Sequence, residues 1–290
     1  MIMIMNKNCR PCITPRPLIR LALLVLMLPG PACSIAELDT TQRRENGLVV
    51  ILPGIEGPSY WNHNLARGLA DGGVRNAIQI YDWGTKIPGG MLLNLTDYER
   101  NREMAASLRD HIVAYRREYP SRGVHLVGHS GGAGIAVMAT EMLPENERAT
   151  TVILLAAALS PEYDLQPALS NVSGGIFNYY SKLDAAMLGV GTTVAGTMDR
   201  RHTQAAGAIG FRRPVRQSEA GSDPYRKLHQ VEWSPKMRTY GHFGDHMGWT
   251  HRSFVRRYLA PLIVEFNSWP AHPPTGIDAP RRSSELIAEG

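Results

Sequence analysis

The chain has 290 residues, of which 43% are hydrophobic and 20% are charged, and this composition excludes a disordered or collagen-like protein. The formal net charge is +5, but four of the basic residues precede position 21 in a stretch that contains no acid. Without those four charges the remainder is nearly neutral and has no basic run. A nucleic-acid partner is therefore excluded, because phosphate backbones are bound by clustered Lys and Arg.

The N-terminal stretch has the layout of an export signal. A basic part ends at Arg20, an apolar run follows at 21–28, and Pro-Gly-Pro-Ala leads to Cys33. The apolar run is too short to span a bilayer, which needs about 20 residues. Cys33 resembles the acylated cysteine of a bacterial lipoprotein, although Gly30 stands where that pattern has Leu. We expect an exported protein in the periplasm, in the cell envelope or outside the cell, either lipid-anchored to a membrane or free.

The positions of the cysteines limit the chemistry of the chain, and its composition indicates how it divides into segments. All three cysteines precede residue 34, so the body can form neither a disulfide nor a thiolate metal site. We expect a signal peptide at 1–33, a polar linker at 34–46, a catalytic domain at 47–266 and a proline-containing tail at 267–290.

Short apolar runs alternate with helical periodicity throughout the body, which predicts an α/β fold. Strands buried on both faces belong to a parallel sheet covered by helices, so we expect a three-layer α/β/α sandwich with a mostly parallel sheet of about six strands. Its ligand site should lie at the carboxyl ends of the strands. The predicted strands are 48–52, 77–81, 124–127, 151–158, 175–180 and 230–233.

Two helices can be placed from the pattern of apolar residues. The clearest spans 99–118, where Met104, Leu108 and Ile112 recur every four residues. A second should follow Thr250 as its N-cap and be bent or interrupted at Pro261.

The strongest chemical signal is Gly128-His-Ser130-Gly-Gly132, which directly follows a predicted strand and precedes an apolar, glycine-containing helix. This G-x-S-x-G pattern is typical of a sharp turn whose central serine is exposed at the strand's end, and it needs glycines because side chains there would collide. Ser130 would lie at a helix N-terminus, which favours developing negative charge. We predict that Ser130 is a nucleophile.

These residues resemble the α/β-hydrolase superfamily, and specifically its lipase and esterase members. The resemblance extends over 47–266 and includes a second segment at 48–55, a strand that enters a glycine turn. It implies an oxyanion hole formed by the backbone N–H groups of Ile55 and Gly131, although Pro53 stands where relatives often have His. It also implies that the usual first hairpin is missing and that 159–174 is too short for a large cap.

The superfamily order along the chain is Ser, then acid, then His. Asp184 follows the strand predicted at 175–180 and is the expected acid, while Asp164, after the preceding strand, is the alternative. A serine needs such a pair because a base must remove its proton and a third group must orient the base.

Three histidines near the predicted last strand compete for the role of base. His246 is favoured because it lies between small residues shortly before the last helix. His242 is the alternative, and His251 is less favoured because it should start the helix. His129, inside the turn, is expected to pack.

No metal and no cofactor are expected. The histidines of 242–251 lack both a nearby cysteine and the H-E-x-x-H pattern. The glycine-rich segment 189–196 lacks the third glycine of a dinucleotide-binding loop, and no strand precedes it as that loop requires. The long segment 185–229 either covers part of the site or forms a helix with a surface loop.

The expected function is that of a serine hydrolase that cleaves carboxylic esters through an acyl-enzyme, acting on a small-molecule or lipid ester. Two alternatives stay open: a noncatalytic envelope binding protein on a degenerate hydrolase fold, and a serine hydrolase for amides or thioesters.

Overall fold

The structure is a computed structural model that describes residues 35–88, 90–186, 196–214 and 223–269. The predicted signal at 1–33 with Cys33, nearly all of the glycine loop at 189–196 and most of the tail predicted at 267–290 lie outside the described residues. The described residues belong to one compact unit.

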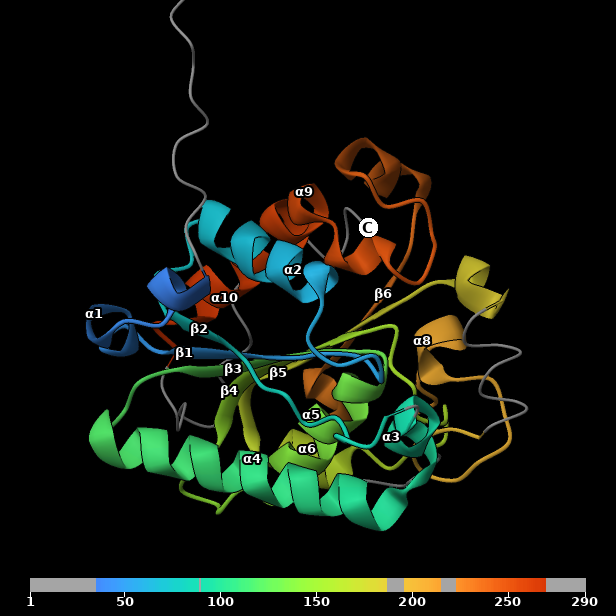
Figure 1. The fold of residues 1–290 in the computed structure, drawn as a ribbon, viewed down its shortest axis with the longest axis horizontal. Helices are drawn as coiled ribbons and strands as arrows, with labels where there is room; N and C mark the ends of the chain where they lie inside the picture. The colour runs from blue at the N-terminus through green and yellow to red at the C-terminus, as the bar shows by residue number, and fades with distance from the viewer. Residues whose placement is uncertain (1–34, 89, 187–195, 215–222, 270–290) are drawn as a thin grey trace, which may run out of the picture. The chain divides into compact units, whose positions relative to one another are not determined.

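A six-stranded sheet in the order β2-β1-β3-β4-β5-β6 forms the centre of this unit, and every strand pair is parallel (Figure 1). Each strand begins and ends within three residues of its predicted range, so the predicted α/β class is confirmed. The strands are β1 (Leu48–Leu52), β2 (Ala77–Ile80), β3 (Val124–His129), β4 (Ala149–Leu155), β5 (Val172–Tyr180) and β6 (Leu228–Glu232).

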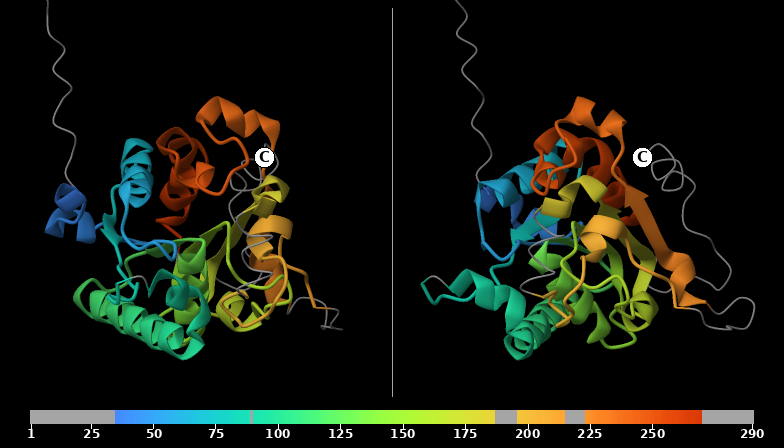
Figure 2. Two further views of the ribbon diagram at one scale, coloured as in Figure 1. Left: turned by 45° about the vertical axis from the view of Figure 1, so that its right-hand side comes forward. Right: turned by 90° about the vertical axis from the view of Figure 1, so that its right-hand side faces the viewer.

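Helices cover both faces of the sheet, which confirms the three-layer arrangement (Figures 1 and 2). On one face lie α2 (Tyr60–Asp71), α9 (Arg252–Phe254) and α10 (Ala260–Phe266). On the other lie α4 (Tyr98–Glu118), α5 (Gly131–Glu141) and α6 (Gln166–Ser170). Because both faces are covered, every residue of β1, β3 and β4 is buried, which explains their continuous apolar sequences.

The remaining elements are short and lie in the connections between strands. They are η1 (Ile35–Leu38), α1 (Thr41–Arg44), η2 (Gly90–Leu92), α3 (Leu93–Thr96), η3 (Lys182–Ala186), α8 (Ala206–Ile209), η4 (Pro224–Lys227), η5 (Pro235–Tyr240), η6 (Gly248–Thr250) and the π-helical turn η7 (Val255–Leu259).

Helix α4 begins one residue before the predicted range and ends at its last residue. The carboxylate of Asp97 accepts a hydrogen bond from the backbone N–H of Arg100 and so caps the first turn. Leu108 and Ile112 are fully buried, as their four-residue spacing predicted.

The last helix differs from the prediction at its start. Thr250 is not the N-cap, because it ends the 3-10 turn η6 and its hydroxyl donates to the carbonyl of Met247. His251 takes the N-cap position of α9 with an extended backbone. The predicted interruption near Pro261 is confirmed, since a π-helical turn precedes the proline, which cannot donate a backbone hydrogen bond.

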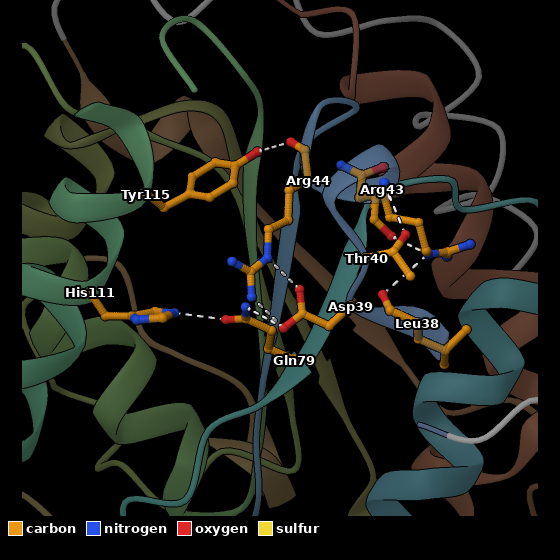
Figure 3. Close-up of polar contacts among 9 residues, drawn as sticks. Leu38, Asp39, Thr40, Arg43, Arg44, Gln79, His111 and Tyr115 are labelled. Carbon is orange, nitrogen blue, oxygen red and sulfur yellow. Dashed lines mark hydrogen bonds and ion pairs between the residues drawn. The ribbon is translucent and has the colours of Figure 1, made fainter. Parts of the chain in front are cut away.

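The segment predicted as a linker at 34–46 contains η1 and α1, and polar contacts join it to the edge of the sheet (Figure 3). Arg44 pairs with Asp39 at 2.7 Å, and Gln79 of β2 donates to the same carboxylate. Gln79 also bonds His111 of α4, and the hydroxyl of Tyr115 donates to the carbonyl of Arg44. These contacts fasten the segment to the edge strand β2 and to helix α4.

The carboxyl ends of all six strands meet at the opposite edge of the sheet, toward the right of Figure 1. The loops that follow these ends hold every candidate residue of the predicted site. No helix in the described part of the chain is long and apolar enough to cross a membrane.

Candidate active site

Ser130 lies in a strained turn between β3 and α5, with φ 53° and ψ −117°. Its backbone N–H donates to the carbonyl of Leu155 at 2.8 Å, and its own carbonyl accepts from Ala158 at 3.1 Å. One bond is made to the last residue of β4 and the other to the segment that follows β4, and together they hold the turn in place. The geometry is that of a strand-turn-helix elbow, in which the hydrogen bonds to the sheet offset the backbone strain.

The two flanking glycines are required by close packing. A Cβ on Gly128 would lie 2.5 Å from Cα of Ala133, and a Cβ on Gly132 would collide with the carbonyl oxygen of Leu52. Helix α5 can therefore approach the end of β1 closely because these positions carry no side chain. This is the steric reason that the sequence pattern predicted.

His246 and Asp184, which are 62 residues apart in the chain, are hydrogen-bonded: His246 Nδ1 lies 2.7 Å from Asp184 Oδ2. A carboxylate can only accept, so Nδ1–H donates, and in the neutral tautomer that carries this proton Nε2 is the acceptor. Both residues are buried, with 8% exposure for His246 and 2% for Asp184. Desolvation raises the pKa of the Asp184 carboxyl, and the hydrogen bond from His246 opposes that rise.

His129 connects this pair to the elbow. Its Nε2 lies 3.0 Å from the backbone carbonyl of His246, and the two ring centroids are 4.7 Å apart. Burial lowers the pKa of His129 to about 3, so the ring is uncharged and Nε2–H is the donor. His129 thus packs against the ring of His246, as predicted. Its hydrogen bond holds the backbone of His246 close to the turn at Ser130.

The other two histidines are engaged elsewhere. His242 is fully buried against Trp249, with ring centroids 4.0 Å apart, and its Nδ1 accepts from the N–H of Gly244. Burial lowers its pKa to about 3. The ring of His251 covers Gly241, which leaves no room for a side chain there. The structure therefore brings neither of them to Asp184.

Asp164, the alternative acid, lies at the start of α6. Its Oδ1 accepts from the backbone N–H of Gln166 at 3.1 Å and from the hydroxyl of Tyr225 at 2.9 Å. These are the contacts of a structural carboxylate that caps a turn.

The two predicted oxyanion donors lie next to each other. A Cβ on Gly131 would lie 2.9 Å from Cγ2 of Ile55. The N–H of Gly57 donates to the carbonyl of Gly54 at 3.0 Å, and in a trans peptide the N–H of Ile55 points away from that carbonyl. Within the described residues neither the N–H of Ile55 nor that of Gly131 has an acceptor.

Two residues that the sequence did not single out hold this loop. The indole N–H of Trp83 donates to the carbonyl of Pro53, and the side-chain amide of Asn94 donates to the carbonyl of Ile55, each at 2.8 Å. Arg100 bonds both the carbonyl of Trp83 and Oδ1 of Asn94. The only sequence signal for them is their position in the segment after β2, at the carboxyl edge of the sheet.

A cleft of about 260 Å³ opens between this loop and the segment after β2. Its charged side chains are Glu56, Asp82 and Lys86, and Ile87 and Met91 add apolar surface. It adjoins the proposed oxyanion donor Ile55, so it lies beside the elbow.

Most of the exposed large apolar side chains belong to segments that follow the carboxyl ends of the strands. Among the large apolar side chains of the described residues that are exposed, all but Val264 follow the carboxyl end of a strand. We call this group the apolar rim; it comprises Tyr60, Trp61, Ile87, Met91, Leu92, Leu93, Leu183 and Phe243.

No group of three His, Cys, Asp or Glu side chains among the described residues is arranged to hold a metal ion. The segment 196–214 packs on the ends of β4 and β5, where Met198 donates to Ala158 and Gly207 to Ala157. Part of the long segment 185–229 thus lies against the sheet near the elbow.

The parallel sheet, its strand order and a serine elbow between the third strand and its helix define an α/β-hydrolase fold, and the chain has this fold. No family model and no curated protein matches the sequence. Among solved structures, the chain is similar to LpqC, a poly(3-hydroxybutyrate) depolymerase from Bordetella parapertussis, at 13% identity over 86% of this chain and 84% of that one, with a TM-score of 0.45. It is also similar to a thioesterase domain from the curacin biosynthetic pathway, at 15% identity over 76% and 92% of the two chains, with a TM-score of 0.38. The fold assignment rests on the strand order and the elbow.

Proposed function

We propose that the protein is a serine hydrolase that cleaves carboxylic esters through an acyl-enzyme, with Ser130 as nucleophile, His246 as base and Asp184 as acid. The observation that carries this proposal is the 2.7 Å bond between His246 and Asp184, held beside the elbow by His129. A buried carboxylate that fixes the tautomer of a histidine next to an elbow serine is the arrangement that activates a hydroxyl.

In the first half-reaction, His246 Nε2 removes the proton of Ser130 Oγ as the oxygen attacks the ester carbonyl. The negative charge of the tetrahedral intermediate forms at the N–H groups of Ile55 and Gly131, and such a donor is worth about 2.7–4 kcal/mol. The imidazolium, stabilised by Asp184, then gives its proton to the leaving alcohol.

In the second half-reaction, water attacks the acyl carbonyl while His246 removes a proton from it. The bond from the acyl carbon to Ser130 Oγ then breaks, Oγ takes the proton back from His246, and the carboxylic acid is released. The described residues provide no hydrogen-bond partner for Ser130 Oγ. This agrees with the proposal, because such bonds often tighten only when substrate is bound.

The apolar rim favours esters with an apolar arm over charged peptides or sugars. Eight of the nine large apolar side chains that are exposed among the described residues follow the carboxyl ends of strands, where the proposed site lies, and this supports an apolar arm on the substrate. We further propose an exported location from the composition of 1–33, and mass spectrometry of the mature N-terminus tests it.

A fluorophosphonate probe tests the central proposal, because it reacts only with an activated serine. We expect labelling of the wild type and of Ser170→Ala, a serine at the end of α6, and none of Ser130→Ala. A panel of p-nitrophenyl esters on the same variants should show Ser130-dependent hydrolysis. A folded wild type that neither reacts with the probe nor cleaves any ester would leave the noncatalytic binding protein as the better interpretation.

A further inference from the structure

Ser181, the residue that directly follows β5, has a buried hydroxyl that the proposed mechanism does not use. Its side chain is fully buried, and its Oγ–H donates to the backbone carbonyl of Gly244 at 2.8 Å. The same oxygen accepts from the N–H of Leu183 at 3.2 Å, and the carbonyl of Ser181 accepts from the N–H of Asp184 at 3.0 Å. Ser181 therefore shapes the turn that carries the proposed acid and binds the loop that carries the proposed base.

Gly244 is two residues before His246, and its backbone is held from two sides. Its carbonyl accepts from Ser181, and its N–H donates to Nδ1 of His242 at 3.1 Å. It has a φ of 95°, and a Cβ there would lie 2.7 Å from Cδ1 of Leu183. Glycine thus lets the loop of the base approach the turn of the acid closely. The two segments are joined at this second point besides the bond between the two side chains of the pair.

The bond from Ser181 also completes a closed series of hydrogen bonds around the site. The series joins Ser130 to Ala158, Ala157 to Gly207, Gly207 to Ser181, Ser181 to Gly244, and His246 to His129. The first three bonds are made between backbone groups, whereas the last two are made by the side chains of Ser181 and His129. A substitution of Ser181 therefore opens the series between acid and base and leaves the bonds of the elbow in place.

The separation of the acid and the base depends on contacts between loops. Asp184 lies in the short 3-10 turn η3, and His246 lies between the turns η5 and η6. Neither side chain is fixed by a strand or by a long helix. Without the hydroxyl of Ser181, the carbonyl of Gly244 would be buried without its donor, which is costly and favours a shift of the loop that leads to the base.

We propose that Ser181 is a positioning residue, whose hydroxyl fixes the distance and orientation between Asp184 and His246. This inference rests on the proposed function and deepens it, because it names a side chain outside the triad on which the activity of Ser130 depends. Ser181 acts through His246. The imidazolium requires the carboxylate most in the transition state, so a misplaced pair lowers kcat.

Ser181→Ala tests the inference, with Ser173→Ala as the matched control. Ser173 lies at the other end of β5, is also buried, and its hydroxyl donates to the carbonyl of Ala149. For Ser181→Ala we expect kcat on p-nitrophenyl esters to fall about 10- to 100-fold with KM changed little, because the groups that bind the ester stay in place. Ser173→Ala should keep the wild-type kcat. Ser181→Cys keeps the shape and has only a weak donor, so it should show a smaller loss of kcat and serves if the alanine variant does not fold.

A second measurement reports on the pair in the resting protein and needs no substrate. The proton on Nδ1 of His246, which is bonded to a carboxylate, should give a strongly deshielded ¹H NMR signal that is assigned by its loss in His246→Ala. In folded Ser181→Ala or Ser181→Cys this signal should move upfield or broaden, and in Ser173→Ala it should stay. A purely structural role would lower the thermal unfolding midpoint and leave the signal of the folded protein unchanged.

The outcomes separate this inference from the proposed function. A wild-type kcat or an unchanged signal in the folded Ser181 variant would overturn the inference, while labelling of Ser130 and hydrolysis by the wild type keep the proposed function. A wild type that neither reacts with the fluorophosphonate probe nor hydrolyses any ester would overturn both.

Discussion

The side chain of Asn94 offers a direct test of how the oxyanion loop is held. Its amide donates to the carbonyl of Ile55 at 2.8 Å, its Oδ1 accepts from Thr85 at 2.7 Å, and it is 3% exposed. Asn94→Ala removes these contacts and the bond that Oδ1 accepts from Arg100, and it leaves the carbonyl of Ile55 without its partner. The loss of one buried partner costs about 1–3 kcal/mol of folding free energy.

The cost to catalysis follows from the peptide that this carbonyl belongs to. The bond from Asn94 fixes the peptide after Ile55, and the turn closed by Gly57 fixes the peptide before it, which carries the proposed donor N–H. One oxyanion donor stabilises the transition state by about 2.7–4 kcal/mol. The loss of one of the two restraints should remove part of that stabilisation. We expect kcat to fall about 10- to 100-fold with KM changed less than about threefold, because the donor acts mainly in the transition state.

The assay compares ester hydrolysis and thermal unfolding of Asn94→Ala with those of Asn171→Ala. The side-chain amide of Asn171 likewise donates to backbone carbonyls, those of Glu141 and Leu143, but Asn171 lies before β5, at the amino ends of the strands. Both variants should lose stability, and Asn94→Ala alone should lose kcat and bind a trifluoromethyl ketone, an analogue of the tetrahedral intermediate, more weakly. Equal kcat in the two variants would refute the positioning role of Asn94.

Three further predictions concern the proposed triad. Ser130→Ala should remove nearly all ester hydrolysis and leave the thermal unfolding midpoint close to that of the wild type; an unchanged kcat would refute the assignment. Asp184→Asn should lower kcat by on the order of 10⁴ by reversing the tautomer of the base, whereas Asp164→Asn should change kcat little. His246→Ala should abolish activity at every pH, whereas His242→Gln should keep the fall of kcat/KM on acidification. Because the folded-state pKa of His242 is lowered to about 3, its contribution to stability is present above the unfolded value of about 6.5 and is lost as pH falls toward 3, so urea unfolding of His242→Gln should depend less on pH in that range.

The sequence alone could not decide which histidine pairs with the predicted acid. His246, His242 and His251 lie within ten residues of one another, and all three side chains have the same chemistry. The structure separates them by packing: Trp249 covers one, Gly241 lies under another, and His246 meets Asp184. These contacts join segments far apart in the chain, so local spacing could favour one histidine but could not decide among them.

The sequence by itself determined the six strands, the order of elements and the elbow at Ser130, because these depend on local periodicity and on glycines that a sharp turn requires. The tertiary structure alone revealed the contacts of Asn94 and Trp83 with the oxyanion loop and the carboxylate of Glu56 at the cleft. In a parallel sheet, neighbouring strands are joined by long crossovers, so residues about 40 positions apart meet where their strands end. Such meetings depend on the strand order and on the packing of loops, and no local pattern in the chain encodes them.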